Sequence, residues 1–380
     1  MNSLFENLKA FNTSNNRSTE EEAAYKPDVT IYKNDPQDPQ GAITMFQRME
    51  MFVEFKRGNS SDPFGTGDEP FTKLLKNACS TRGQMTLYSA RQQAYQFRTS
   101  VLTVGIFGKS ARFLRWDRTG SKVTAPIDYS TAEGNRHLTE FFTRFDRMSP
   151  EARGWDPTVK DATKKEIEDF DEAVRKASRR PSENGKKAKG EKKAEGGKKT
   201  KGGSMDPLFS KLVDSVGKHD EYPRKKVSVL DGKKTKYYII GRPTMVVKSP
   251  TGRATRGFVA MCMETKRLVF LKDSWRPDIE GIEAEDHWYG VLRTKRAKHI
   301  GAFSHGSDVY GTKNFIRCHD KKQRTLSNLY AEEYGGSERM MGYVHYRVVQ
   351  SELYIPLELF RSSKHLTTVM FDIALGTVLP

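Results

Sequence analysis

Apolar residues alternate with polar ones along several short stretches of the first 160 residues, a pattern that predicts strands. In "MEMFVEFKRG" (49–58), the alternation places Glu50, Glu54 and Lys56 on one face. "KPDVTIY" (26–32) predicts a shorter strand that begins at Pro27-Asp28. "SARQQAYQFRTS" predicts a helix that carries Gln92, and "VLTVGIFG" and "ARFLRWDRTG" predict two further strands. We therefore expect an α/β domain over 25–160, after a flexible N-terminus over 1–24.

Residues 205–380 show a different pattern. Apolar and β-branched runs at 237–248, 258–263 and 268–272 are separated by charged or glycine-containing turns, which predicts three successive antiparallel strands. "EDHWYGVL" (285–292) then predicts a helix with Trp288 on its apolar face. The chain as a whole is expected to have a mixed fold of the α+β or α/β class.

A basic segment separates the two halves. Residues 161–177 predict an amphipathic helix, with Phe170 on its apolar stripe. Residues 178–204 then hold ten Lys/Arg, three acidic residues and no large apolar side chain, so they supply much of the net charge of +17. Such a composition cannot bury a core, and we expect a disordered linker. It is either a solvated spacer or a nuclear-import or nucleic-acid tether.

The composition indicates the cellular compartment of the protein. No apolar run approaches the roughly 18 residues that a membrane helix needs, and the N-terminus lacks the basic and apolar regions of a secretion signal. Cys79, Cys262 and Cys318 match neither a disulfide framework nor a zinc-ligand spacing. We expect a cytoplasmic or nuclear protein with no membrane partner.

The first half carries charged residues in a spacing that resembles PD-(D/E)xK nucleases. Asp28 is followed about 25 residues later by Glu54 and Lys56. Two carboxylates can hold Mg²⁺ or Mn²⁺ beside a scissile phosphate, while a lysine stabilises the charge that develops. Gln92 is a further candidate residue for this nuclease site. The alternatives are an inactive nuclease-like fold and an unrelated α/β domain with a charged strand face.

Arg112, Arg115 and Arg118 would suit a phosphate-rich partner such as nucleic acid, or are simply solvated on an edge strand.

In the second half, a glycine-bearing turn precedes a strand that ends in a lysine. Gly252 and Gly257 let backbone N–H groups approach phosphate oxygens. Lys272 follows three apolar residues and needs an anionic partner, which a nucleotide phosphate or Glu285 could provide. Lys272 and Glu285 occur in the order found in a kinase small lobe.

Residues 25–380 resemble the fungal-type protein kinase family. The resemblance rests on "TGRATRGFVA", "VFLKDSW", "YVHYRVV" and "PLELF", and, before the basic segment, on "RFLRWDRTG" and "RGWDPTV". It implies that Lys272 is the small-lobe lysine, Glu285 its helix partner, Gly252 to Gly257 the phosphate loop, ATP the cofactor and a protein the substrate or partner. It also implies that 345–349 leads into the adenine-reading hinge.

The sequence departs from that family in two places. The glycine spacing is G-x-x-x-x-G in place of G-x-G-x-x-G, and the segment after the hinge contains neither an H-R-D-type catalytic loop nor D-F-G. "CHDKKQR" (318–324) precedes the hinge and is expected to be a loop. We therefore expect a pseudokinase-like small lobe, truncated after the hinge, that binds ATP without transferring phosphate. A metal-dependent nuclease and a non-catalytic interaction module are the alternatives.

Overall fold

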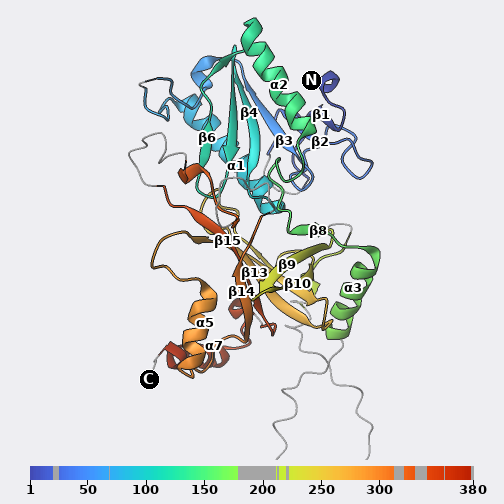
Figure 1. The fold of residues 1–380 in the computed structure, drawn as a ribbon, viewed down its shortest axis with the longest axis vertical. Coiled ribbons are helices and arrows are strands. Elements are labelled where there is room, and N and C mark those ends of the chain that lie inside the picture. The colour runs from blue at the N-terminus through green and yellow to red at the C-terminus, as the bar shows by residue number, and fades with distance from the viewer. Residues whose placement is uncertain are drawn as a thin grey trace, which may run out of the picture.

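The computed structural model describes residues 1–19, 25–67, 69–178, 211, 214–219, 222–311, 321–329, 340–354 and 356–377, with the side chains of 375–377 left out. Two β-sheets lie end to end, each with helices packed on it, so the chain is a mixed α+β protein (Figure 1). In the described part, no helix is long and apolar enough to cross a bilayer.

The first sheet has the order β1-β2-β3-β4-β5-β6, and β7 also pairs with β5. Its central strands β3 and β4 are parallel because the long helix α1 crosses between them, whereas β2–β3 and β4–β5 are antiparallel. The elements are β1 (Leu8–Asn12), β2 (Val29–Lys33), β3 (Met51–Lys56), α1 (Lys76–Tyr95), β4 (Val101–Phe107), β5 (Ser110–Trp116), β6 (Ser121–Val123), β7 (Ile127–Asp128) and α2 (Ala132–Arg147).

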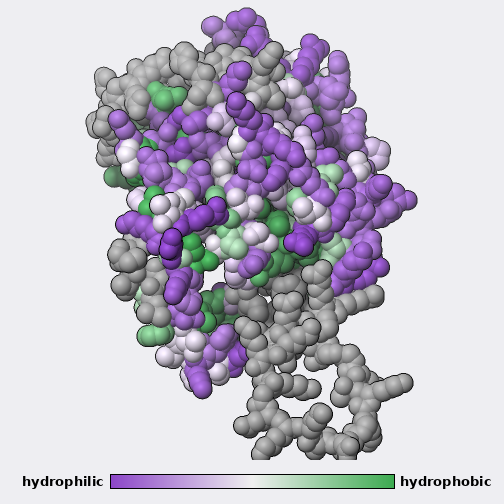
Figure 2. Space-filling model, turned by 60° about the horizontal axis from the view of Figure 1, so that its bottom comes forward, coloured by the Kyte–Doolittle hydropathy of each residue, from purple (hydrophilic) through white to green (hydrophobic). Residues whose placement is uncertain are grey.

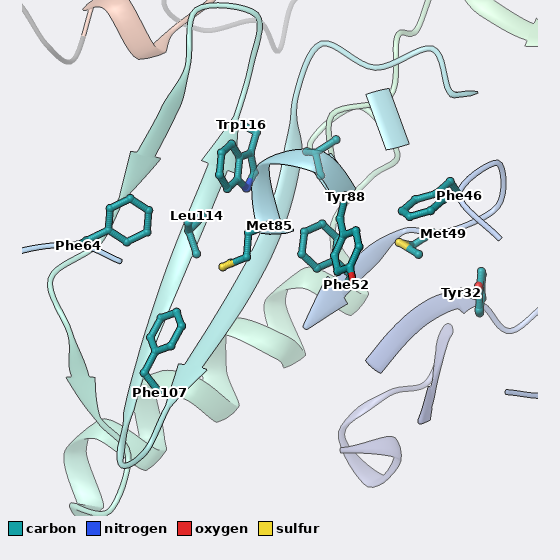
Figure 3. Close-up of a cluster of buried hydrophobic side chains, with 11 residues drawn as sticks. Tyr32, Phe46, Met49, Phe52, Phe64, Met85, Tyr88, Phe107, Leu114 and Trp116 are labelled. Atoms are coloured by element: carbon teal, nitrogen blue, oxygen red, sulfur yellow. The ribbon is translucent and has the colours of Figure 1, made fainter. Parts of the chain in front are cut away.

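The two faces of this sheet pack against different helices. On one face, Phe52 lies in a cluster with Met85 and Tyr88 of α1 (Figure 3). On the other face, Val53 lies in a cluster with Phe142 of α2. The strict alternation along β3 therefore turns every second residue, including Glu54 and Lys56, toward the α1 side.

The N-terminus is more ordered than the sequence predicts. The expectation of a flexible 1–24 is wrong for residues 8–12, which pair with β2 as β1. The carboxylate of Asp146 at the end of α2 accepts hydrogen bonds from the backbone N–H groups of Glu6, Asn7 and Leu8. A partner 138 residues away in the chain holds this segment, so local sequence could not reveal it.

The second sheet has the order β14-β15-β13-β12-β10-β9-β8, with β11 paired to β12. The strands are antiparallel, as expected from the apolar runs and turns in 237–272. The elements are β8 (Val159–Asp161), α3 (Lys164–Ser178), β9 (Lys225–Asp231), β10 (Lys234–Ile240), β11 (Met245–Val246), β12 (Arg256–Cys262), β13 (Leu268–Pro277), α5 (Glu285–Thr294), β14 (Phe303–Asp308), β15 (Tyr343–Gln350) and α7 (Ser363–Thr377).

The boundary between the two units lies earlier than the sequence indicates. β8 pairs with β9, and Phe170 of α3 packs in a cluster with Ile239 and Val259 of the second sheet. The second unit therefore begins near residue 158, and the basic segment joins two elements of that unit, α3 and β9. The segment itself, 179–204, lies outside the described residues, as do Cys318, His319 and Asp320.

The surface is mainly polar. On the face drawn in Figure 2, hydrophilic residues surround smaller groups of exposed apolar ones. The exposed apolar residues include Met370 and Phe371 of α7 and Trp288 of α5.

Candidate functional sites

The predicted nuclease residues meet at one edge of β3. Lys56 Nζ donates a hydrogen bond to Glu54 Oε1 over 2.6 Å. Asp28, just before β2, accepts one from the backbone N–H of Phe55 through Oδ2 over 2.7 Å. β2 and β3 are neighbours in the sheet, so residues about 25 positions apart in sequence come together, as the Asp28, Glu54, Lys56 spacing predicts.

Glu54 is held in an unusual environment for a carboxylate. Its side chain is buried, and among the described residues its Oε2 atom has no hydrogen-bond partner. Burial is the main cause that raises the pKa of Glu54 to about 7; the hydrogen bond and charge of Lys56 oppose this rise, and the charge of Asp28 adds to it. At neutral pH this carboxyl can therefore exchange a proton, and a cation placed at Oε2 would favour its ionised form.

The helix residue beside this cluster is Gln84, not Gln92. Gln84 Oε1 accepts from Lys56 Nζ over 3.0 Å, and Gln84 Nε2 donates to the hydroxyl of Tyr88 over 2.8 Å. Gln92 lies two turns away and donates to the backbone carbonyls of Met49 and Glu50, which is a structural role. The i, i+4 spacing of Gln84 and Tyr88 is the signal that could have identified them.

The donor set fits a magnesium-like ion better than a transition metal. In the described part of the chain, no group of three or more His, Cys, Asp or Glu side chains could hold a metal. Mg²⁺ is commonly held by only one or two carboxylates, with water and substrate phosphate completing its shell. Asp28 and Glu54 supply that number. A bound ion there would polarise a phosphate oxygen, and Lys56 lies close enough to stabilise charge on it.

The predicted kinase pair is formed in the second unit. Lys272 Nζ on β13 lies 2.5 Å from Glu285 Oε2, the first residue of α5. Both side chains are about one quarter exposed, so an anionic ligand can still reach the ammonium group. Thirteen residues separate them in sequence, and the turn from β13 into α5 brings them together.

Tyr346 of β15 positions α5. Its hydroxyl donates to Asp286 Oδ1 over 2.7 Å and accepts from the Asp286 backbone N–H over 2.9 Å. These two bonds anchor the first turn of the helix next to Glu285. The family resemblance implied an element at 345–349, which lies within β15, but gave Tyr346 no role.

The predicted phosphate loop, Gly252 to Gly257, does not form a turn with free backbone N–H groups at both glycines. Gly257 lies inside β12, opposite Lys272, and a Cβ there would lie 2.7 Å from the ring of Phe270. Gly252 has φ +88°, which favours glycine, but its N–H donates to the carbonyl of Arg118 in the first unit. The residues before β12 therefore contact the first unit, and Gly252 does not present a free N–H.

The arginines of β5 and its following turn are structural. Arg112 is buried and binds Asp62 and backbone carbonyls, and Arg118 is buried with bonds to the carbonyls of Ser249 and Gln93. β5 lies between β4 and β6 and is not an edge strand. The expectation that these two arginines face a nucleic acid is wrong; Arg115, partly exposed, pairs with Asp117.

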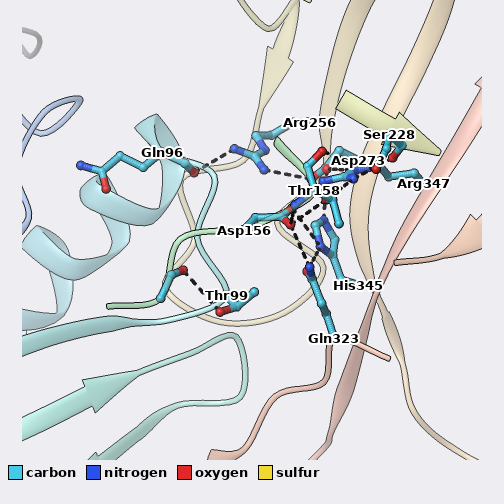
Figure 4. Close-up of polar contacts among 11 residues, drawn as sticks. Gln96, Thr99, Asp156, Thr158, Ser228, Arg256, Asp273, Gln323, His345 and Arg347 are labelled. Atoms are coloured by element: carbon cyan, nitrogen blue, oxygen red, sulfur yellow. Dashed lines mark hydrogen bonds and ion pairs between the residues drawn. The ribbon is translucent and has the colours of Figure 1, made fainter. Parts of the chain in front are cut away.

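A buried polar network joins the two units (Figure 4). Arg347 of β15, fully buried, binds Asp156 of the first unit over 2.6 Å and Asp273 of β13 over 2.8 Å. His345 binds Asp273 and Gln323. Asp156 belongs to "RGWDPTV" and Asp117, which accepts from the N–H groups of 326 and 327, belongs to "RFLRWDRTG". These two sequence phrases thus form the contact between the units.

A scan of the sequence against models of protein families matches none, and searches of curated proteins and of solved structures return no significant match. Function must therefore be argued from the geometry of the two sites.

Proposed function

We propose that the second unit is a protein-kinase-like small lobe of the fungal type, and that it binds the phosphates of ATP at Lys272. The observation that carries the proposal is the 2.5 Å contact between Lys272 and Glu285. In protein kinases, a strand lysine paired with a helix glutamate holds the α- and β-phosphates.

The surrounding elements support the same proposal. Helix α5 follows β13 directly and packs near β14, and its first turn is anchored by Tyr346. Because directly opposite residues in an antiparallel pair share a face, Lys272 lies on the same face as Gly257, which has no side chain of its own, and as Val348 on the other side. The ammonium group of Lys272 is the main recognition element, since the N–H of Gly252 is already bonded.

Thermal unfolding with Mg-ATP tests this function. A ligand present at about a hundred times its Kd stabilises the protein by roughly 2.7 kcal/mol. We expect ATP to raise the Tm of the wild type clearly more than that of Lys272→Met. Lys226→Met is a matched control, because Lys226 also forms a 2.7 Å pair with a glutamate of its own unit, Glu166. No response of the wild type at millimolar Mg-ATP would rule the proposal out.

We propose metal-dependent phosphodiester hydrolysis by the first unit as a second candidate function. The side chain of Glu54 favours this function. Its buried Oε2 atom has no hydrogen-bond partner in the described part of the chain, and the pKa of the carboxyl is about 7. The parallel pair β3–β4 with α1 between them agrees with the α/β core that the resemblance to PD-(D/E)xK nucleases implies.

Manganese-dependent cleavage of single- and double-stranded DNA and RNA tests the second candidate. We expect Glu54→Gln to abolish cleavage, and Asp38→Asn, which alters another buried carboxyl with a raised pKa, to retain it. Equal cleavage by wild type and Glu54→Gln would show that a contaminant is responsible. If neither ATP binding nor cleavage is found, a non-catalytic interaction module remains.

A further inference from the structure

A cavity of about 810 Å³ lies between the two units, away from both sites described above. Small-molecule sites are typically about 300–1,000 Å³ and are often found between domains. Its walls come from the end of α1, the segment around Trp155 and, in the second unit, residues near β11 and the start of β12.

The cavity lies on the opposite face of the second sheet from Lys272. Gly257 is directly opposite Lys272 in the β12–β13 pair, so those two share a face. Arg256 and Phe258, which line the cavity, flank Gly257 and therefore point to the other side. A ligand in the cavity would thus not compete with ATP at Lys272.

The charge of the lining is positive. Seven Lys or Arg and four Asp or Glu side chains line it. Three of the acidic groups are engaged by cations: Asp156 by Arg347, Asp161 by Lys225 and Asp38 by Arg48. Within the described residues, Arg242 forms no ion pair with a carboxylate, and both Arg242 and Lys160 are exposed. An anion would therefore be favoured here.

Flat aromatic rings lie beside this positive charge. The guanidinium of Arg242 lies 5.0 Å from the ring centre of Tyr222, and Lys248 Nζ lies 5.2 Å from that of Tyr95. A nucleoside phosphate carries the complementary pair of groups, a planar apolar base and an anion a short distance away. Aromatic rings and arginines recognise these two parts by stacking and by charge-assisted hydrogen bonds.

We propose that this cavity binds a nucleoside phosphate, with its phosphate at Arg242 and its base beside Tyr222 and Tyr95. The same chemistry is offered by a free mononucleotide and by one nucleotide of a single strand. This site goes beyond the proposed ATP site at Lys272, and it does not depend on it.

The test uses the full chain carrying Lys272→Met, so that binding at the proposed ATP site does not interfere. Fluorescence anisotropy is measured with methylanthraniloyl-AMP and, separately, with a labelled short oligothymidylate. We expect Arg242→Glu to weaken binding about tenfold or more, because it replaces a charge-assisted hydrogen bond by repulsion. Lys160→Glu, a second exposed change at the cavity, should weaken it as well.

Arg136→Glu is the matched control, since Arg136 is exposed on α2 far from the cavity lining. Binding of the AMP probe with this dependence assigns the site to free nucleotides, and binding of the oligothymidylate alone assigns it to a strand. Binding of neither probe, or equal effects of Arg242→Glu and Arg136→Glu, overturns the proposal. Unchanged Tm values of the variants show that their fold is retained.

Discussion

At the scale of single residues, the most informative side chain is Glu54. Sequence spacing selected it together with Asp28 and Lys56, and the structure adds that it is buried beside a cation. A carboxyl whose pKa lies near neutrality costs folding free energy once it ionises, unless an ion compensates it. Such groups are frequent at functional sites, because chemistry benefits from a poised proton.

We predict that Glu54 makes stability depend on pH. Its pKa is about 7 in the folded chain, compared with an ordinary value of 4.5, so between these pH values the folded state holds more protons than the unfolded state. The free energy of unfolding should therefore fall as pH rises through this window and level off above about 7. Glu54→Gln should remove this fall, a relative gain at pH 8 on the order of 2–3 kcal/mol.

Urea denaturation at pH 5 and pH 8 measures this difference. Glu133→Gln, on the exposed side of α2, should keep the pH dependence of the wild type. Parallel curves for wild type and Glu54→Gln would contradict the raised pKa.

At the scale of elements, helix α5 depends on its first turn. None of its residues is buried, and Trp288 is more than half exposed. A ten-residue helix with so little packing is marginal by itself, so its orientation relies on the bonds between Tyr346 and Asp286 and on the pair of Glu285 with Lys272.

We predict that Tyr346→Phe loosens α5 without unfolding the sheet. The change removes two hydrogen bonds, each worth about 0.5–1.5 kcal/mol. Hydrogen exchange of residues 285–294 should accelerate, and the stabilisation by Mg-ATP should decrease. Tyr289→Phe removes a hydroxyl that accepts from Gln350 but does not hold the first turn, so its exchange in residues 285–288 should match the wild type. Unchanged exchange in Tyr346→Phe would show that other contacts position the helix.

At the scale of the whole molecule, contacts with the first unit stabilise the second sheet. Arg347, Asp273 and Asp156 form an ion-pair network that is almost completely buried and joins three segments distant in sequence. The contact also fixes the residues before β12, through the bond from Gly252 to the carbonyl of Arg118. We therefore expect the two units to unfold together.

We predict that Asp156→Ala destabilises the full chain by about 3–5 kcal/mol, because it leaves a buried arginine short of one carboxylate. Urea unfolding followed by fluorescence should show a lower midpoint and two separated transitions. Asp169→Ala breaks an exposed pair with Lys266 and should leave the midpoint close to that of the wild type. A single transition at the wild-type midpoint in Asp156→Ala would show that the network does not couple the units.

Short-range sequence patterns alone predicted several strands and helices of this protein and two groups of charged residues that lie together. Alternation located β2 and β3 to within a few residues, because strand burial has a period of two, and apolar, β-branched runs located β12 and β13. Helices α3 and α5 followed from amphipathic spacing. The proximity of Asp28, Glu54 and Lys56, and that of Lys272 and Glu285, could be expected because each group lies on neighbouring elements.

Other features were decided by contacts between distant segments, which no local pattern encodes. The strand at 8–12 depends on Asp146, and the assignment of β8 and α3 to the second unit depends on pairing with β9 across the basic segment. Gln84 replaces Gln92 because the register of α1 on the sheet selects which turn faces Lys56. Sequence therefore determined many of the elements and two local pairs of charged residues, whereas tertiary packing decided the unit boundary, the contact between the units and the cavity that lies between them.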